Sequence, residues 1–377
     1  MVEEILGSIG ISGLVLVIVG VALLIVVVLL MSYFKTLVSI ANFSYPNAKF
    51  RARGSTFVKK DEIEDLLETK SIKEVYSEIR KNGYEIPQEA TEDMGEIEKE
   101  LEESTLEIIK RARNVSPEAT KPLVEAWLYR YDGKMVKRAT KAIDRGADQK
   151  EIMDLLRPVK IIDQDMIDRI ASARNKQELF SILNETEFEE ILSEVELDSG
   201  SFRLDLALDR FAFQKLKEAV MKVESEERAS VKYFIGKYTD IFNLKMIFRV
   251  LKEDISKKEL GSFLLPSGWE LKEWKIEDIL EAKNLEEALV ELEGTSYSDL
   301  RQKGASEDPF EVEKVLDQKL LDLASEMSSK YILSVGPLLK YLVAKELELR
   351  NLKVLIRGLK EDVPPEKMKD MMILEGN

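Results

Sequence analysis

IEDLLETKSIKEVYSEIRKNGY, at Ile63–Tyr84, is the stretch of sequence that decides the fold, because it occurs again as IEDILEAKNLEEALVELEGTSY at Ile276–Tyr297. The two copies align without gaps and share nine of 22 residues, where unrelated sequences of ordinary composition share about one or two. A third, more diverged copy, IDRIASARNKQELFSILNETEF, lies at Ile167–Phe188. Repetition at a regular spacing is typical of an architecture built from one unit, so we predict a triplicated module.

Each copy has the pattern of two short helices separated by a tight break. Apolar residues recur at helical spacing in the first helix, which predicts one buried face. These residues are Ile63, Leu66, Leu67, Ile167, Ile170, Ala171, Ile276, Ile279 and Leu280. The composition agrees with helices throughout, since Glu, Lys, Leu and Ile dominate and strand-type alternation is nearly absent. An all-α fold is therefore predicted.

The break between the two short helices carries its own signals. We expect the first helix to close on a cation, which suits the negative end of its dipole. The next residue should cap the second helix, and a glutamate three residues later should accept a hydrogen bond from the amide of that cap. The cations are Lys70, Arg174 and Lys283, the caps Ser71, Asn175 and Asn284, and the glutamates Glu74, Glu178 and Glu287.

A second element is repeated with a displacement of 108 residues, NLKMIFRVLKED at Asn243–Asp254 against NLKVLIRGLKED at Asn351–Asp362, with eight of twelve residues identical. A faint first copy places apolar residues on the same helical face. The matching apolar positions are Val136, Ala139 and Ile143, then Leu244, Ile247 and Leu251, then Leu352, Leu355 and Leu359. The polar residues that recur in these helices invite a role as partner contacts, but internal packing is favoured, because buried polar groups are normally bonded. They are Asn243, Arg249, Asn351 and Arg357.

The order of the repeated elements predicts three similar helical modules joined continuously. Because the chain begins with a short pair and ends with a long repeated helix, the N-terminal pair should complete a circle with the C-terminal helices. We expect a membrane helix at residues 1–34, the N-terminal part of the first module at 35–95, modules at 96–195 and 196–305, and C-terminal helices that complete the modules at 306–377.

The beginning of the chain has the properties of a transmembrane helix. No charged residue occurs from Ile5 to Phe34, and Ile9–Met31 is long enough to cross about 30 Å of hydrocarbon. A secretory signal peptide is disfavoured, because Glu3 and Glu4 stand where positive charge is usual and no small-residue cleavage site follows.

The flank of this segment predicts its orientation. Six cations follow the apolar segment before the first acid after it, Asp61. Because basic residues stay on the cytoplasmic side, the bulk of the chain should face the cytoplasm from a single-pass anchor in the cell membrane. The cations are Lys35, Lys49, Arg51, Arg53, Lys59 and Lys60. Whether they also contact anionic headgroups, or only set the topology, is left open.

The residue inventory excludes several kinds of chemistry. The chain contains no cysteine and no histidine, which removes disulfides, thiolate nucleophiles, imidazole bases and ordinary zinc sites. A formal net charge of −15 disfavours nucleic acid as a partner, because phosphates require a basic surface. No phosphate-binding loop is present. No catalytic, cofactor or metal site is expected, and the three tryptophans, Trp127, Trp269 and Trp274, are interpreted as packing residues.

Three further stretches together resemble the C subunit of archaeal A-type rotary ATPases, the counterpart of the d subunit in V-type enzymes. They are YPNAKFRARGSTFVKKDEIEDLLETKSIKEVYSEI from Tyr45, LDRFAFQKL at Leu208–Leu216, and LELRNLKVLIRGLKEDVPPEKM from Leu347. The resemblance covers about residues 35 to 375. It rests on packing motifs and carries no catalytic signature.

The resemblance implies a funnel of three similar helical domains that is not itself an enzyme. Such a subunit sits on the ring of membrane proteolipids and receives the central shaft subunits, of the D and F type. It passes torque between proton or sodium flux and ATP chemistry in other chains. Many members of the family lack an N-terminal membrane helix, and a helix outside a turning ring would collide with the stator, so we expect this one to enter the lumen of the ring.

Two alternatives stay open at this point. A membrane-tethered helical scaffold that recruits another cytoplasmic complex would share these features, apart from association with proteolipids. A membrane-bound hydrolase would require a cleft of carboxylates or lysines with perturbed pKa values.

Overall fold

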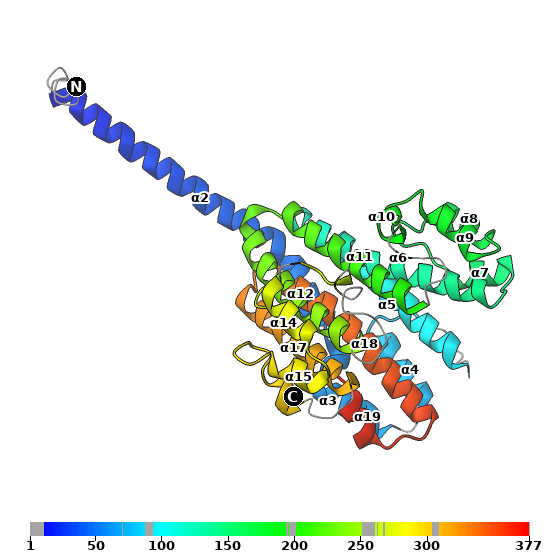
Figure 1. Ribbon diagram of the computed structural model, residues 1–377. Helices are drawn as coiled ribbons and strands as arrows, with labels where there is room; N and C mark the ends of the chain where they lie inside the picture. Colours follow the sequence, from blue (N-terminus) through cyan, green and yellow to red (C-terminus); the bar gives the residue numbers. More distant parts are fainter. Residues whose placement is uncertain are drawn as a thin grey trace.

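The computed structural model describes most of the chain as helices packed beside one long projecting helix (Figure 1). The described residues are 11–69, 71–86, 93–193, 195, 201–250, 261, 263–266, 268–303 and 309–376. Within these residues every regular element is a helix, and the only strand-like pairing is an isolated bridge between Lys59 and Glu375. The prediction of an all-α chain is confirmed.

The N-terminal helix α2 runs from Ile11 to Arg53 without ending at residue 34. Its segment Val15–Phe34 has a mean hydropathy of 3.3 and is not buried at all against the rest of the chain. By length and composition it is apolar enough to cross a membrane. Figure 1 shows this part as a rod standing clear of the other helices, whereas the last turns of α2 pack among them. Residues 1–10 of the predicted segment lie outside the described residues.

Six long helices form three successive pairs, each joined by a short turn. The pairs are α5 (Met94–Val115) with α6 (Lys121–Asp144), α11 (Ser201–Lys222) with α12 (Ser225–Val250), and α17 (Pro309–Lys330) with α18 (Gly336–Lys360). The pairs also pack against one another, since α6 contacts α11, α12 contacts α17, and α18 contacts α5. The three pairs therefore make a closed circle of contacts.

A repeated ladder of ion pairs accompanies these contacts. Two positions of α12, two of α18 and one of α6 face two acids on the first helix of the next pair. The ladder joins Lys137 with Asp205 and Asp209, Lys245 with Asp317, Arg249 with Glu313, Lys353 with Glu98 and Glu102, and Arg357 with Glu98. The cations Lys137, Lys245 and Lys353 are spaced by the 108-residue displacement found in the sequence. Single surface ion pairs add only about 0 to 1 kcal/mol, so the ladder acts mainly on register.

The short helices also occur as three pairs, as predicted. They are α3 (Lys60–Glu68) with α4 (Ile72–Lys81), α8 (Gln164–Ala171) with α9 (Lys176–Leu183), and α14 (Glu273–Glu281) with α15 (Leu285–Val290). The predicted apolar face is buried in each first helix, and only Leu280 is half-buried. The remaining helices in the described ranges are η1 (Thr56–Val58), η2 (Glu118–Thr120), α7 (Gln149–Leu155), α10 (Glu189–Leu192), α16 (Leu300–Lys303) and α19 (Pro365–Met371).

The caps of the second short helices are confirmed in two copies. Asn175 accepts a hydrogen bond from the Glu178 amide, and Asn284 accepts one from the Glu287 amide, both at 2.9 Å. Ser71 makes no such bond. In the first copy the Thr69 hydroxyl instead donates to the Glu74 carboxylate.

Two details of the predicted break are wrong. Glu178 and Glu287 accept from the amides of Arg174 and Lys283, the residues before the caps, and not from the caps themselves. These two cations also lie after their helices, because α8 ends at Ala171 and α14 at Glu281. The carboxylate thus tightens the break itself. The third predicted cation, Lys70, lies outside the described residues.

The recurring asparagines of the long helices serve internal packing, as favoured from the sequence. Asn243 both donates to the Leu265 carbonyl (2.8 Å) and accepts from the Leu265 amide (2.9 Å). Asn351 makes the same pair of bonds with Ile373. In the first pair the equivalent position is Met135, whose sulfur accepts from the Arg157 amide at 3.4 Å. The second helix of each long pair therefore binds, through its residue 135, 243 or 351, the backbone of the residue 22 positions later.

A buried acid on each of the same helices holds the start of a short pair. Asp132 accepts from the amides of residues 160–162, and Asp240 accepts from those of Glu270 and Leu271. The third acid is Glu348, which accepts from the amide of Phe57 (3.1 Å). Phe57 precedes α3, so the N-terminal short pair is held by the C-terminal helix α18.

The contacts around Phe57 close the circle that the repeat order predicts. Asn351 donates to the carbonyls of both Phe57 (2.9 Å) and Ile373 (2.8 Å). The amide of Glu375 donates to the carbonyl of Val58 at 2.7 Å. The loop that is one continuous segment in the other two copies is therefore made here of two segments from opposite parts of the chain.

Candidate functional site

The second helices of the three long pairs meet at a polar centre. Arg130 of α6, Tyr238 of α12 and Glu346 of α18 stand at the 108-residue spacing, so they are equivalent positions of the three copies. Arg130 forms an ion pair with Glu346 at 2.5 Å, and its guanidinium carbon lies 5.4 Å from the centre of the Tyr238 ring. It also lies 4.9 Å from the Trp127 ring. The same position of the repeat is thus a cation in one copy, an aromatic ring in the second and a carboxylate in the third.

The electrostatics of the polar centre favour fixed charges. Burial opposes the charged form of Arg130, but Glu346, Tyr238 and Asp209 together outweigh it and raise the pKa of the guanidinium. Burial likewise raises the pKa of the Tyr238 hydroxyl. An arginine and a tyrosine held in these states neither take up nor release protons near neutral pH, so the polar centre is suited to holding three helices in register and not to acid–base work.

A cavity of about 500 Å³ opens beside the polar centre, between α18, α5 and α19. Its lining mixes acids and cations in equal number: Glu98, Glu102, Glu346 and Glu361 with Lys134, Arg350, Lys353 and Arg357. Several of these pair with one another, including Lys353 with Glu98 at 3.5 Å. Apolar side chains such as Leu349 and Met368 complete the wall. The cavity lies along the second half of α18, away from the turn that precedes this helix.

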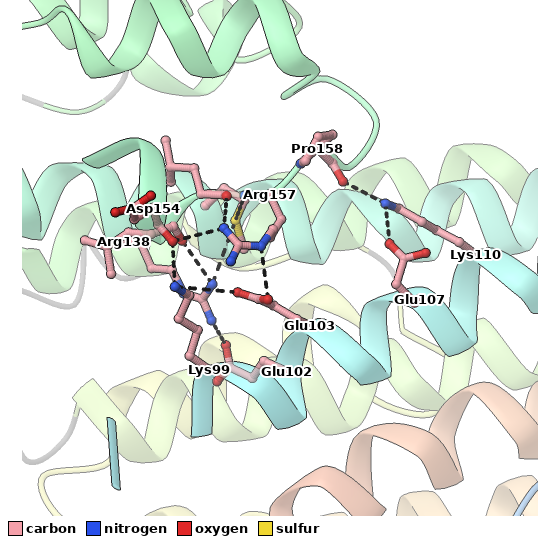
Figure 2. A network of polar contacts seen from close by, with 12 residues as sticks. Lys99, Glu102, Glu103, Glu107, Lys110, Arg138, Asp154, Arg157 and Pro158 are labelled. Carbon is pink, nitrogen blue, oxygen red and sulfur yellow. Dashed lines mark hydrogen bonds and ion pairs between the residues drawn. The ribbon is translucent and has the colours of Figure 1, made fainter. Parts of the chain in front are cut away.

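A network of basic side chains holds the loop after α7 to the first long pair (Figure 2). Lys99 donates to the Asp154 carbonyl (2.5 Å), and Lys110 donates to the Pro158 carbonyl (2.7 Å). Arg157 donates to the Asp154 carbonyl and pairs with Glu103, both at 3.0 Å. Because these cations are bonded to backbone carbonyls and to acids within the chain, the network fixes the end of α7 and the loop after it beside α5 and α6.

The opposite end of the long helices presents apolar side chains. The turn between α17 and α18 exposes Ile332 and Leu333 by 41% and 48%. It lies against α2, because Asn47 donates to the carbonyls of Ile332 (3.0 Å) and Ser334 (2.8 Å). This apolar end is therefore the end from which the projecting helix leaves.

The interpretation of the tryptophans as packing residues is confirmed for Trp127, holds in part for Trp269 and is wrong for Trp274. Trp127 is buried in the core, but Trp269 is 43% exposed and Trp274 is 61% exposed. Trp269 still packs edge-on against Tyr233, with ring centres 5.0 Å apart. Trp274 stands on the surface, with the Lys275 ammonium 5.7 Å from its ring centre.

Sequence reasoning assigned no site residues and missed the polar centre. A signal for it was present, because shifting the repeated long helix by 108 residues aligns Arg130 with Tyr238 and Glu346. This signal did not identify the site, because arginine, tyrosine and glutamate are side chains of different chemical types. Among the described residues there is no group of three or more acids, cysteines or histidines that could hold a metal ion.

Comparison with known proteins points to one family. The family model described as ATP synthase (C/AC39) subunit matches residues 46–371. The chain is 27% identical to the A-type ATP synthase C subunit of Methanocaldococcus jannaschii over 353 residues, which cover 90% of this chain and 88% of that protein. It is 29% identical to the C subunit of Methanothermobacter thermautotrophicus, over 88% of this chain and 87% of the relative. The identity to the C subunit of Pyrococcus furiosus is 27%, over 88% and 90%.

Proposed function

The chain belongs to the ATP synthase (C/AC39) subunit family, and from that premise we propose that it is the central-stalk adaptor of an A-type ATP synthase. It joins the ring of membrane proteolipids to the rotor shaft, which is made of D-type and F-type subunits. It carries out no chemistry itself, because nucleotide hydrolysis or synthesis takes place in other chains. The coupled ion is a proton or sodium.

The closed circle of three long pairs carries this proposal. A part that transmits torque must keep its shape under load, and this chain ties its first short pair to its last long helix through Phe57 and Asn351. The polar centre lies near the middle of the long helices, the charged cavity extends from it toward one end, and the apolar turn with α2 lies at the other. Two unlike ends suit two unlike partners, with the charged cavity facing the shaft and the apolar end facing the membrane ring.

The projecting helix anchors the adaptor, with the bulk of the chain on the cytoplasmic side, in agreement with the cations that flank the apolar segment. We place Val15–Phe34 inside the lumen of the proteolipid ring, where it can turn with the rotor. A photo-crosslinker at Leu23 should then react with proteolipids in the intact complex, whereas one at Tyr45, outside the apolar segment, should not reach their membrane-embedded parts. Crosslinks from Leu23 to stator membrane subunits, with none to proteolipids, would contradict this placement.

Purification of the tagged full-length chain in mild detergent tests the function. Recovery of the proteolipid ring together with shaft subunits supports the adaptor role. Recovery of an unrelated cytoplasmic complex would instead favour a membrane-tethered scaffold. Recovery of the chain alone would contradict both.

A further inference from the structure

A second cavity, of about 320 Å³, lies where the N-terminal segment meets the first and last long pairs. It is formed by the end of α2, the turn after α4, the second half of α5 and the first half of α18. Five cations and a single carboxylate line it: Lys49, Arg53, Arg80, Arg111, Lys345 and Glu85. In a chain with a net charge of −15, this local excess of positive charge is the reverse of the molecule as a whole. We name it the basic pocket.

Two of its cations are not neutralised by any residue in the described parts of the chain. Lys49 and Arg53 lie four residues apart, so they share one face of α2. Neither side chain makes a hydrogen bond or an ion pair to any residue that the structure describes. By contrast, Arg111 pairs with Glu85, and Lys345 pairs with the buried Glu348 at 2.6 Å. The positive charge that remains therefore belongs chiefly to the face of α2.

The repeat indicates that two of these cations, Arg80 and Arg111, are not required for packing. Arg80 aligns with Asn184 and Glu293 in the other short pairs. Arg111 aligns with Glu218 and Glu326, if α5, α11 and α17 are superposed through their ladder acids. Residues that solve the common packing problem recur, as Asn243 and Asn351 do. Arg80 and Arg111 occur in one copy only, whereas Lys345 recurs as Lys237.

Cations in the last turn of a helix also stabilise its dipole, and this could explain Arg51 and Arg53 by themselves. It does not explain why three further cations from α4, α5 and α18 converge on the same cavity. One wall is apolar, made by Phe50, Ile108 and Val115. A cavity with such a wall and several guanidinium and ammonium groups fits an oxyanion, since arginine forks match phosphate geometry.

We propose that the basic pocket binds a phosphate-bearing anion. Such an anion could be a soluble polyphosphate or the headgroup of an anionic lipid. Lys49 stands 15 residues beyond Phe34, the end of the apolar segment, or about 22 Å along a helix. The headgroup layer is only about 5 to 8 Å thick on each side, which favours the soluble source. The inference concerns the isolated chain and does not depend on the adaptor role.

Calorimetric titration of the full-length chain in non-ionic detergent with pyrophosphate tests the soluble source. We expect saturable binding that Arg53→Gln and Lys49→Gln each weaken by about tenfold, the worth of one charge-assisted contact. Arg51→Gln is the matched control, since Arg51 lies on the same turn of α2, is exposed and lines a different cavity. Binding to that variant should be unchanged.

A separate measurement tests the lipid headgroup as the source of the anion. If the anion is a headgroup instead, nanodiscs of phosphatidic acid and phosphatidylcholine should raise the Tm of the chain above its value in phosphatidylcholine alone, and Arg53→Gln should abolish the rise. That result, without pyrophosphate binding, assigns the pocket to a headgroup. Absence of both effects would overturn the proposal. An equal loss in Arg51→Gln would overturn it too, because it would show diffuse attraction to a basic surface.

Discussion

The buried acid Asp132 lacks a hydrogen bond that its equivalents in the other two copies make, because one residue differs between the copies. Asp240 and Glu348 each accept a hydrogen bond from a tyrosine hydroxyl, Tyr297 at 3.4 Å and Tyr84 at 2.8 Å. The residue that aligns with these tyrosines in the remaining copy is Phe188, which has no hydroxyl. One oxygen of Asp132, Oδ2, is accordingly buried without a hydrogen-bond partner in the part of the chain that the structure describes.

Phe188→Tyr should supply the missing donor. A hydroxyl placed as in the other two copies would donate to Asp132 Oδ2, and a hydrogen bond of this kind is worth about 1 kcal/mol or more. We expect a higher Tm at pH 7 for the full-length chain in detergent. The matched control is Tyr297→Phe, which should lower the Tm by removing the equivalent bond to Asp240. A lower Tm for Phe188→Tyr would show that the copies differ in local geometry.

The same acid predicts a pH dependence of stability. Burial raises the pKa of Asp132 to about 6, despite the opposing hydrogen bonds from the backbone amides of residues 160–162. Because the folded pKa lies above the unfolded value, the stabilising contribution of this group is complete below about pH 4 and is lost as the pH rises through 6. The loss is about 2 to 3 kcal/mol.

Asp132→Asn removes this titration while keeping an oxygen acceptor for the three amides. Between pH 4 and 7 the Tm of the Asp132→Asn variant, relative to its value at pH 4, should therefore fall less than that of the parent chain. Melting curves at pH 4, 5, 6 and 7 give the comparison. Parallel curves for the two proteins would contradict a raised pKa at this position.

At the scale of elements, the second helix of a short pair starts with a side-chain cap in two copies and without one in the first. Asn175 and Asn284 cap α9 and α15 with their side chains, whereas Ser71 does not cap α4. The glutamate of the first copy is held by Thr69 instead. The helices still start at equivalent positions, because buried apolar faces fix them in all three copies.

Alanine at Asn175 and alanine at Ser71 should therefore have unequal effects on stability. Asn175→Ala should destabilise the chain by about 1 kcal/mol, the usual cost of losing an N-cap. Ser71→Ala should change stability little, because no hydrogen bond is lost. Urea unfolding of the two variants in detergent measures both. Equal losses would indicate that Ser71 caps α4 after all.

The elements were largely predictable from the sequence, because their signals are local. Apolar spacing predicted the buried faces of the short pairs, and the repeated asparagines predicted internal bonds. The partners of Asn243 and Asn351 were not predictable, since Leu265 and Ile373 lie in loops whose amide and carbonyl positions leave no sequence pattern. The extension of α2 to Arg53 was also missed, because the change from apolar to polar residues at Lys35 suggested an end where the backbone continues unbroken.

At the scale of the molecule, closure of the circle is the property on which the proposed adaptor role depends. The ladder of ion pairs, the polar centre and the paired segments near Phe57 all join parts of the chain that are far apart in sequence. The order of the repeats predicted this closure, but it could not predict Arg130, Tyr238 and Glu346 at the centre. Three different residues at one repeated position leave no recurring pattern, and only their contacts reveal the site.

An engineered disulfide tests the closure. Lys59 and Glu375 face each other in a bridge, where Cα atoms lie about 5 Å apart. The chain has no cysteine, so Lys59→Cys with Glu375→Cys should oxidise to one disulfide and raise the Tm by constraining the unfolded chain. Each single variant serves as a control. Failure to oxidise under mild conditions would show that these segments do not meet.

Ion pumping by the reconstituted complex tests the adaptor role most directly. Vesicles that contain the assembled ATP synthase should build an ion gradient when ATP is added. A complex prepared without this chain should still hydrolyse ATP but build no gradient, and adding the chain back should restore pumping. An undiminished gradient in the absence of the chain would contradict the claim that it couples the membrane ring to the shaft.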